Sequence, residues 1–95
     1  MIEYLYNAIK ASPGEELVIC ANITDDEGNA LTDCESYFRI FDKDNEIYKV
    51  RGTYNDGHWN YVIPDAVSAE YKGTYWYCIC ADGSTLQFKE HIYFV

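Results

Sequence analysis

WNYVIPDAVSAEYKGTYWYCICADGSTLQFKEHIYFV, residues 59–95, is the stretch that decides the fold of this chain. Its apolar residues alternate with polar ones as far as Pro64, which ends a strand because proline has no N–H to donate to a sheet. Residues 74–81 and 85–95 are two further strand segments on either side of Asp82-Gly83, a dipeptide typical of hairpin turns. No long helical pattern interrupts them, so the stretch predicts an antiparallel β structure.

The same alternation continues toward the N-terminus. Leu17, Ile19 and Ala21 form one apolar set in a period of two, and Asp56-Gly57 predicts a second hairpin turn. The chain is therefore predicted to be a single all-β domain, residues 1–95, built as an immunoglobulin-like two-sheet antiparallel sandwich of about seven strands. A small closed barrel is the alternative architecture. The expected strands lie near residues 2–10, 17–24, 37–41, 47–53, 59–63, 74–81 and 85–95.

Composition limits the classes of partner. Ninety-five residues suffice for one core, and apolar residues make up 48% of the chain. The net charge of −9 argues against nucleic acid and against an anionic membrane surface, both of which attract clustered Lys and Arg. The N-terminal residues do not read as a signal peptide, and no apolar run is long enough to span a bilayer. We therefore expect the chain to fold in a cytoplasm.

The four cysteines do not follow the immunoglobulin pattern. Cys20 and Cys78 lie opposite the apolar sets of their own strands, so in two different sheets they point to opposite outsides of a sandwich. Their Cα atoms are then expected to be too far apart for a disulfide. Cys78 and Cys80 are same-face neighbours on one strand, a poor geometry for a mutual disulfide. We expect four reduced thiols, as in a reducing compartment.

A structural corner is predicted where the last hairpin begins. Gly73 sets the turn, and Tyr75 is expected to anchor the core while its hydroxyl bonds to backbone of residues 65–72, as in a tyrosine corner. Tyr77 stands two residues later, where an antibody domain has its second cysteine. These three residues are therefore expected to be structural.

The sequence contains no recognisable catalytic set. His58 and His91 are the only ordinary general bases near neutral pH, and neither belongs to a known motif. Asp42 and Asp44 resemble the start of a calcium loop, but Ile47 stands where that loop requires glycine. We expect no catalytic residues, no metal site and no cofactor, and hence no enzyme.

Aromatic side chains that point outward are the best candidates for an interface. Trp76 alternates away from the core set of its strand, as Cys78 does, and exposed aromatic residues are typical of protein interfaces and of sugar-stacking surfaces. The candidate interface residues are Trp76, Cys78, Tyr48 and Tyr54.

Taken together, several short segments resemble small immunoglobulin-like proteins of tailed bacteriophages and prophages, most closely the N-terminal domain of phage baseplate upper proteins. The segments are Gly14-Glu-Glu-Leu17, Asn22-Ile-Thr-Asp-Asp-Glu-Gly28, Phe38-Arg-Ile-Phe-Asp42, Tyr61-Val-Ile-Pro64, Gly73-Thr-Tyr75 and Asp82-Gly-Ser-Thr-Leu-Gln-Phe88. The resemblance implies a non-enzymatic virion protein without catalytic residues.

Two functions follow as expectations. The first is a structural or assembly protein of a phage head, neck, tail or baseplate, which contacts capsid, tail or baseplate proteins or its own copies, and passes from the host cytoplasm into the virion. Open strands at the sheet edges could add to a neighbour's sheet. The second is a carbohydrate- or host-surface-binding module that uses exposed aromatic residues.

Overall fold

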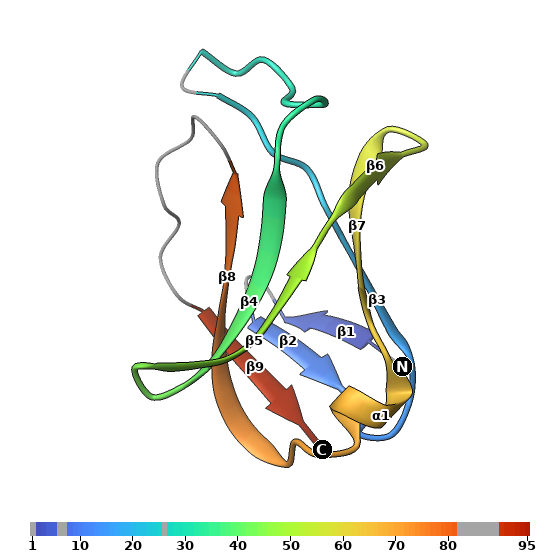
Figure 1. The fold of residues 1–95 in the computed structure, drawn as a ribbon, viewed down its shortest axis with the longest axis vertical. Helices are drawn as coiled ribbons and strands as arrows, with labels where there is room; N and C mark the ends of the chain where they lie inside the picture. The colour runs from blue at the N-terminus through green and yellow to red at the C-terminus, as the bar shows by residue number, and fades with distance from the viewer. Residues whose placement is uncertain (1, 6–7, 26, 82–89) are drawn as a thin grey trace.

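The computed structural model describes residues 2–5, 8–25, 27–81 and 90–95. These residues form two β-sheets and a single helical turn, so the expectation of an all-β fold is confirmed (Figure 1). The helical turn is α1 (Asp65–Ser68). The strands are β1 (Ile2–Leu5), β2 (Ala8–Ala11), β3 (Leu17–Ala21), β4 (Ser36–Asp42), β5 (Asn45–Arg51), β6 (Thr53–Asn55), β7 (His58–Ile63), β8 (Gly73–Ala81) and β9 (Glu90–Phe94).

The larger sheet has six strands in the order β1-β2-β9-β8-β4-β5, and the smaller has three in the order β3-β7-β6. Every pairing is antiparallel except that of β2 with β9, which run parallel. Residues 27–35 and the β6–β7 turn lie at one end of the molecule, and α1 lies at the other (Figure 1).

Two of the expected strands are each divided in two, which raises the count among the described residues to nine. The first expected strand, residues 2–10, is the hairpin of β1 and β2. The segment of residues 47–53 passes from the large sheet to the small one at Gly52, whose N–H donates to the carbonyl of Ser36 at 2.8 Å. A strand that changes sheets cannot be read from alternation alone, because both halves keep the same period of two.

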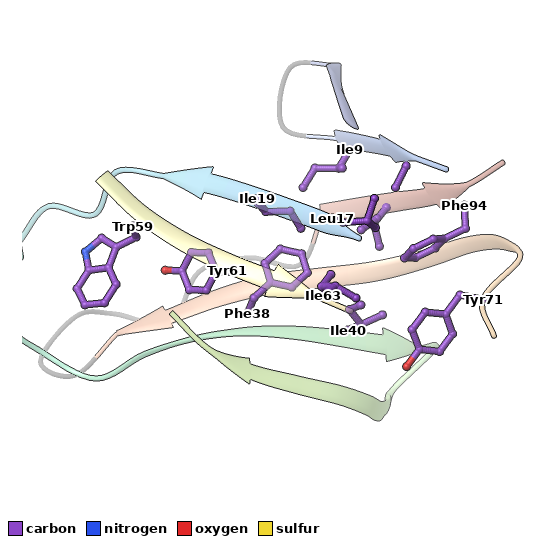
Figure 2. Packing of buried hydrophobic residues seen from close by; sticks show 12 residues of the cluster. Ile9, Leu17, Ile19, Phe38, Ile40, Trp59, Tyr61, Ile63, Tyr71 and Phe94 are labelled. Carbon is purple, nitrogen blue, oxygen red and sulfur yellow. The ribbon is translucent and has the colours of Figure 1, made fainter. Parts of the chain in front are cut away.

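The core lies between the sheets and is filled by the alternating apolar residues. Leu17 and Ile19 from β3 and Tyr61 and Ile63 from β7 are almost completely buried, as their period of two predicts. Figure 2 shows Trp59 and Tyr71 at opposite ends of this cluster. The remaining buried members are Ile9, Ala11, Phe38, Ile40, Ile92 and Phe94.

A polar contact is buried within this core. The Tyr61 hydroxyl lies 2.5 Å from Ser36 Oγ, and Ser36 Oγ also donates to the carbonyl of Cys80 at 3.0 Å. Burial raises the pKa of Tyr61, and the bond to Ser36 opposes part of that rise. The contact thus ties the central strand of the small sheet to both β4 and β8.

The predicted turns are present where the structure describes them. Asp56 and Gly57 both have positive φ, 53° and 86°, as the two central residues of a type I′ hairpin turn require. Between β7 and β8, residues 65–68 form one helical turn. Asp82-Gly83, the other predicted hairpin turn, lies outside the described residues.

Candidate interaction surface

The outer face of the six-stranded sheet is set by alternation along β4. Phe38 and Ile40 point into the core, so Tyr37, Arg39 and Phe41 point away from it. The strand pairing then places Cys80, Cys78 and Trp76 of β8 beside these three residues on the same face. β4 and β8 are interior strands of this sheet, so each has a paired strand on both sides. The outer face is therefore centred on these two strands.

Aromatic rings cover the β8–β9 half of this face. Trp76 and His91 are opposite each other in the strand pairing, and their ring centroids lie 3.9 Å apart. Tyr93 follows on the same face of β9, with its ring stacked on His91 at 5.6 Å. All three side chains are half-buried, and His91 Nδ1 has no hydrogen-bond partner within the described part of the chain. This half of the face is an aromatic platform that solvent still reaches.

Cations cover the β4–β5 half. Lys49 Nζ lies 4.3 Å from the centroid of the Tyr37 ring, and the Arg39 guanidinium lies 4.9 Å from that of Phe41. Both distances are typical of cation–π contacts. Arg39 also donates to Glu46 at 2.5 Å, and this bond is the main reason that the pKa of Arg39 is raised. Arg39 therefore keeps its charge at every physiological pH.

Basic residues are concentrated on this face although the chain as a whole is acidic. Four of the seven Lys and Arg residues lie there, on β2, β4 and β5. Glu46 partners Arg39, and Glu35 lies 3.8 Å from Arg51 in an exposed pair. We call the following set the cationic face: Lys10, Arg39, Lys49 and Arg51, with the rings of Tyr37, Trp76, His91 and Tyr93 between them and the buried ring of Phe41 beneath Arg39.

Of the candidate interface residues, Trp76 lies on the cationic face, but Cys78 is not available for contact. Cys78 does point outward, yet its exposed fraction is only 3%. Arg39 lies directly opposite it on β4 and extends its guanidinium toward Phe41 and Cys80. Cys78 thus points outward as predicted, but its side chain is buried, so the accessible part of this face does not include it.

Tyr48 and Tyr54 do not share this surface either. Tyr48 pairs with Ile40 and packs against the core, and burial raises its pKa. Val50 pairs with the buried Phe38 in the same way, so Tyr48 and Val50 share the core-facing side of β5. Tyr54 lies on β6 in the small sheet, 38% exposed, with its ring edge-on to Trp59. The four candidate residues thus lie at three separate places and do not form one interface.

The predicted corner is present in the structure. Gly73 has φ of +102°, a conformation that L-residues rarely adopt. The Tyr75 hydroxyl accepts a hydrogen bond from the N–H of Lys72 at 3.4 Å, and its ring packs edge-on against Phe94. Tyr77 stacks on Phe38 at 5.1 Å. All three residues therefore serve the fold rather than an exposed site.

The cysteines are placed as the alternation predicted. Cys20 is exposed on the small sheet, and Cys78 lies in the large one. All four cysteines lie within the described residues, and none is in a disulfide. The Cys78 and Cys80 sulfur atoms lie 3.7 Å apart, in contact but not joined by a disulfide bond.

A shallow pocket of about 470 Å³ opens at the end of the molecule where β6 and β7 meet. Tyr54 and Trp59 form its aromatic wall, and Arg51 and Asp33 contribute charge. No group of three or more His, Cys, Asp or Glu side chains is close enough to hold a metal ion in the described ranges. Nor do those ranges contain a helix that is long and apolar enough to cross a membrane.

Sequence reasoning missed the cationic face as a unit. The spacing of Arg39, Lys49 and Arg51 along the chain does not show that they share one face of the sheet. That depends on how β4 and β5 pair. The register Arg39↔Lys49 and Tyr37↔Arg51 is what brings them together. The usable signal was the alternation Tyr37-Phe38-Arg39-Ile40-Phe41, which already placed an arginine between two outward aromatic residues.

Comparison of the chain with protein-family models, with curated proteins and with solved structures gives no match in any of the three.

Proposed function

We propose that the domain is an immunoglobulin-like sandwich that acts through protein–protein contacts as a structural or assembly component of a tailed-phage particle. The strand order supports the first half of this proposal. If β3, β7 and β6 correspond to immunoglobulin strands B, E and D, then β9, β8, β4 and β5 correspond to G, F, C and C′, the order of the facing sheet in variable-type domains. The departure is the β1–β2 hairpin, which extends the sheet beside β9 instead of adding a strand beside β3.

The corner at Gly73 supports the same assignment. In immunoglobulin domains a tyrosine near the start of strand F bonds back to the backbone a few residues upstream. Tyr75 occupies that place on β8 and accepts its hydrogen bond from Lys72, three residues earlier. This feature also belongs to the segments on which the resemblance to phage proteins rests.

The observation that carries the functional proposal is the cationic face. Tyr, Trp and Arg are enriched in the centres of protein interfaces, and they supply most of the binding energy there. Here they share one face of a sheet with half-buried rings and charged side chains held by cation–π contacts. A non-enzymatic role fits this arrangement, because binding requires only the surface itself.

The proposed partners are capsid, tail or baseplate proteins, or further copies of this chain, met first in the host cytoplasm and then in the virion. The test is mass spectrometry of purified particles induced from the genome that encodes the chain. Detection of the chain in stoichiometric amount, followed by location of its density, would support the proposal. Its absence from every purified particle would reject it.

Carbohydrate or host-surface binding is the second candidate, and the pocket beside Tyr54 favours it. An exposed tyrosine ring next to Arg51 and Asp33 offers both a stacking surface and polar groups for sugar hydroxyls. A glycan array probes this directly. Specific binding that is lost in Tyr54→Ala but kept in Trp76→Ala would favour the sugar reading, and binding to no glycan would remove it.

A further inference from the structure

The charges of this molecule are separated onto two different surfaces. The cationic face is one of them. The second is the end of the molecule where β3 finishes and β4 begins. The described residues of the β3–β4 connection, 22–25 and 27–35, and the β6–β7 turn both lie there (Figure 1). A hydrogen bond from Trp59 Nε1 to the carbonyl of Leu31, 2.7 Å long, fixes the connection to β7.

This end is mainly acidic, and Arg51, at the edge of the cationic face, borders it, because Arg51 lines the pocket with Asp33 and lies 3.8 Å from Glu35. Residues 22–35 and 55–58 contain no Lys and no Arg. We call the following carboxylates the acidic end: Asp25, Glu27, Asp33 and Asp56. At the opposite end of the molecule acidic side chains are interspersed with Lys43 and Lys72, so the described loops there do not have a single sign.

The acidic end is also pre-organised. Asp25 Oδ1 accepts hydrogen bonds from the N–H groups of Glu27 and Asn29, each 2.9 Å long. The backbone bond from Asn29 is the main cause of a lowered pKa at Asp25, so this carboxylate stays ionised. A loop that is already ordered loses less conformational entropy when it binds than a disordered one would.

We propose that the acidic end of one copy of this chain docks onto the cationic face of a second copy. The inference rests on the proposed function and gives it a specific contact. The two surfaces are complementary in charge, and the rings of Tyr37, Trp76 and Tyr93 supply the flat contact area between the cations. Because the two surfaces are different, the contact is heterologous, and repetition of it produces a ring or a filament instead of a closed dimer.

Salt is not a decisive probe of this contact. Added salt weakens the attraction between the two surfaces, but it also weakens the repulsion between copies that each carry −9. Neutralising substitutions separate the two effects, because they alter one surface at a time. They are preferable to charge reversals, since two reversed surfaces would attract each other and create a second contact.

The experiment is sedimentation velocity on the full chain over a concentration series up to about 1 mM, the range of weak complexes. The face variant is Lys10→Gln with Lys49→Gln, and the end variant is Glu27→Gln with Asp56→Asn, because Arg51 and Asp33 lie together where the two surfaces meet. Each should weaken self-association by about tenfold or more. The matched controls change the net charge of −9 by the same two units at the opposite end: Lys43→Gln with Lys72→Gln for the face variant, and Asp42→Asn with Glu70→Gln for the end variant. Both should leave association unchanged.

Mixing the face variant with the end variant is the decisive step. The mixture holds one intact acidic end and one intact cationic face, so it should form a 1:1 dimer that grows no further. Circular dichroism melts of each variant check that it is folded. A wild-type chain that stays monomeric throughout the series would overturn the inference, as would variants that associate like wild type or a mixture that stays monomeric.

The wild-type chain could instead stay monomeric and bind a glutamate-rich peptide on its cationic face. That result would overturn the contact between copies and would assign the face to a different acidic partner. Failure here is distinguishable from failure of the proposed function. The chain could be abundant in purified particles and yet monomeric in solution, which rejects only the contact. Conversely, copies that associate as described but never enter a particle would reject only the phage role.

Discussion

Tyr61 leaves no space for a side chain at Gly52. A Cβ atom at Gly52 would lie 2.8 Å from Tyr61 Cδ1 and even closer to Cε1. The ring cannot give way easily, because Tyr61 is fully buried and its hydroxyl is bonded to Ser36. The strand can therefore change sheets at this point only because position 52 is glycine.

We predict that Gly52→Ala destabilises the domain by about 1–3 kcal/mol, the usual cost of overpacking a core. Urea denaturation followed by tryptophan fluorescence measures the change. Thr53→Ala, at the exposed neighbouring position, is the control and should change the free energy of unfolding by less than about 0.5 kcal/mol. A Gly52→Ala protein as stable as wild type would show that Tyr61 moves aside freely.

Gly73 should be intolerant of substitution for a different reason. Its φ is +102°, but no atom lies within 4 Å of where a Cβ would be. We therefore expect Gly73→Val to cost about 1–3 kcal/mol through backbone strain alone. A chemically synthesised chain with D-alanine at position 73 should be nearly as stable as wild type, because a D-residue favours positive φ. Equal destabilisation by both residues would mean that crowding, not conformation, requires the glycine.

Stability should fall in alkaline solution. Burial raises the pKa of Tyr61, Tyr48 and Tyr71 above the value of about 10 for an unfolded tyrosine. The folded state therefore holds these protons more tightly than the unfolded state does. This stabilisation is fully present below about pH 10 and is lost as the pH rises through the higher folded pKa values.

The measurement is the free energy of unfolding between about pH 8 and 11, with Tyr61→Phe as the comparison. The variant has no phenol to ionise at position 61, so its stability should fall less steeply with pH, whatever its stability at pH 8. Identical slopes for the two proteins would show that Tyr61 does not contribute.

The four thiols should react with very different rates. Cys20 is exposed, whereas Cys78 is 3% exposed and lies opposite Arg39 in the strand pairing. A disulfide-exchange reagent added to the native protein should therefore modify Cys20 first and Cys78 last. In denaturant without reductant, four thiols should be counted. Arg39→Ala is expected to accelerate the modification of Cys78, and an unchanged rate would mean that other side chains cover it.

The sequence predicted those parts of the fold that depend on local alternation. Trp59, Tyr61 and Ile63 are buried because a period of two places them on one face, and Asp56-Gly57 forms its turn because those residues accept positive φ. Alternation failed where a distant residue decides the outcome. The break at Gly52 depends on the Tyr61 ring, and the burial of the outward-pointing Cys78 depends on neighbours that alternation does not show.

The candidate interface was harder to predict than the fold. Trp76 was identified correctly as an outward residue, but Tyr48 was not, because its pairing with the buried Ile40 places it on the core-facing side of β5 together with Val50. The cations that accompany Trp76 come from β2, β4 and β5, and only the pairing of those strands brings them onto one face. A surface shared by several strands is a property of register, which a single sequence does not specify.

The parallel pairing of β2 with β9 has a mechanical consequence. The strands are aligned through Ile9↔Ile92 and Ala11↔Phe94, and the N–H of Val95 adds a bond of 3.0 Å to the carbonyl of Ala11. Tension applied to the two ends of the chain would first separate β1 from β2. The force would then act on the N-terminal end of β2 and on the C-terminal end of β9. Because the two strands run in the same direction, these pulls slide them past each other and load all of their hydrogen bonds at once. Stretched in this way, for example in an atomic force microscope, the domain should extend in one abrupt high-force step, whereas gradual low-force unzipping would contradict this geometry.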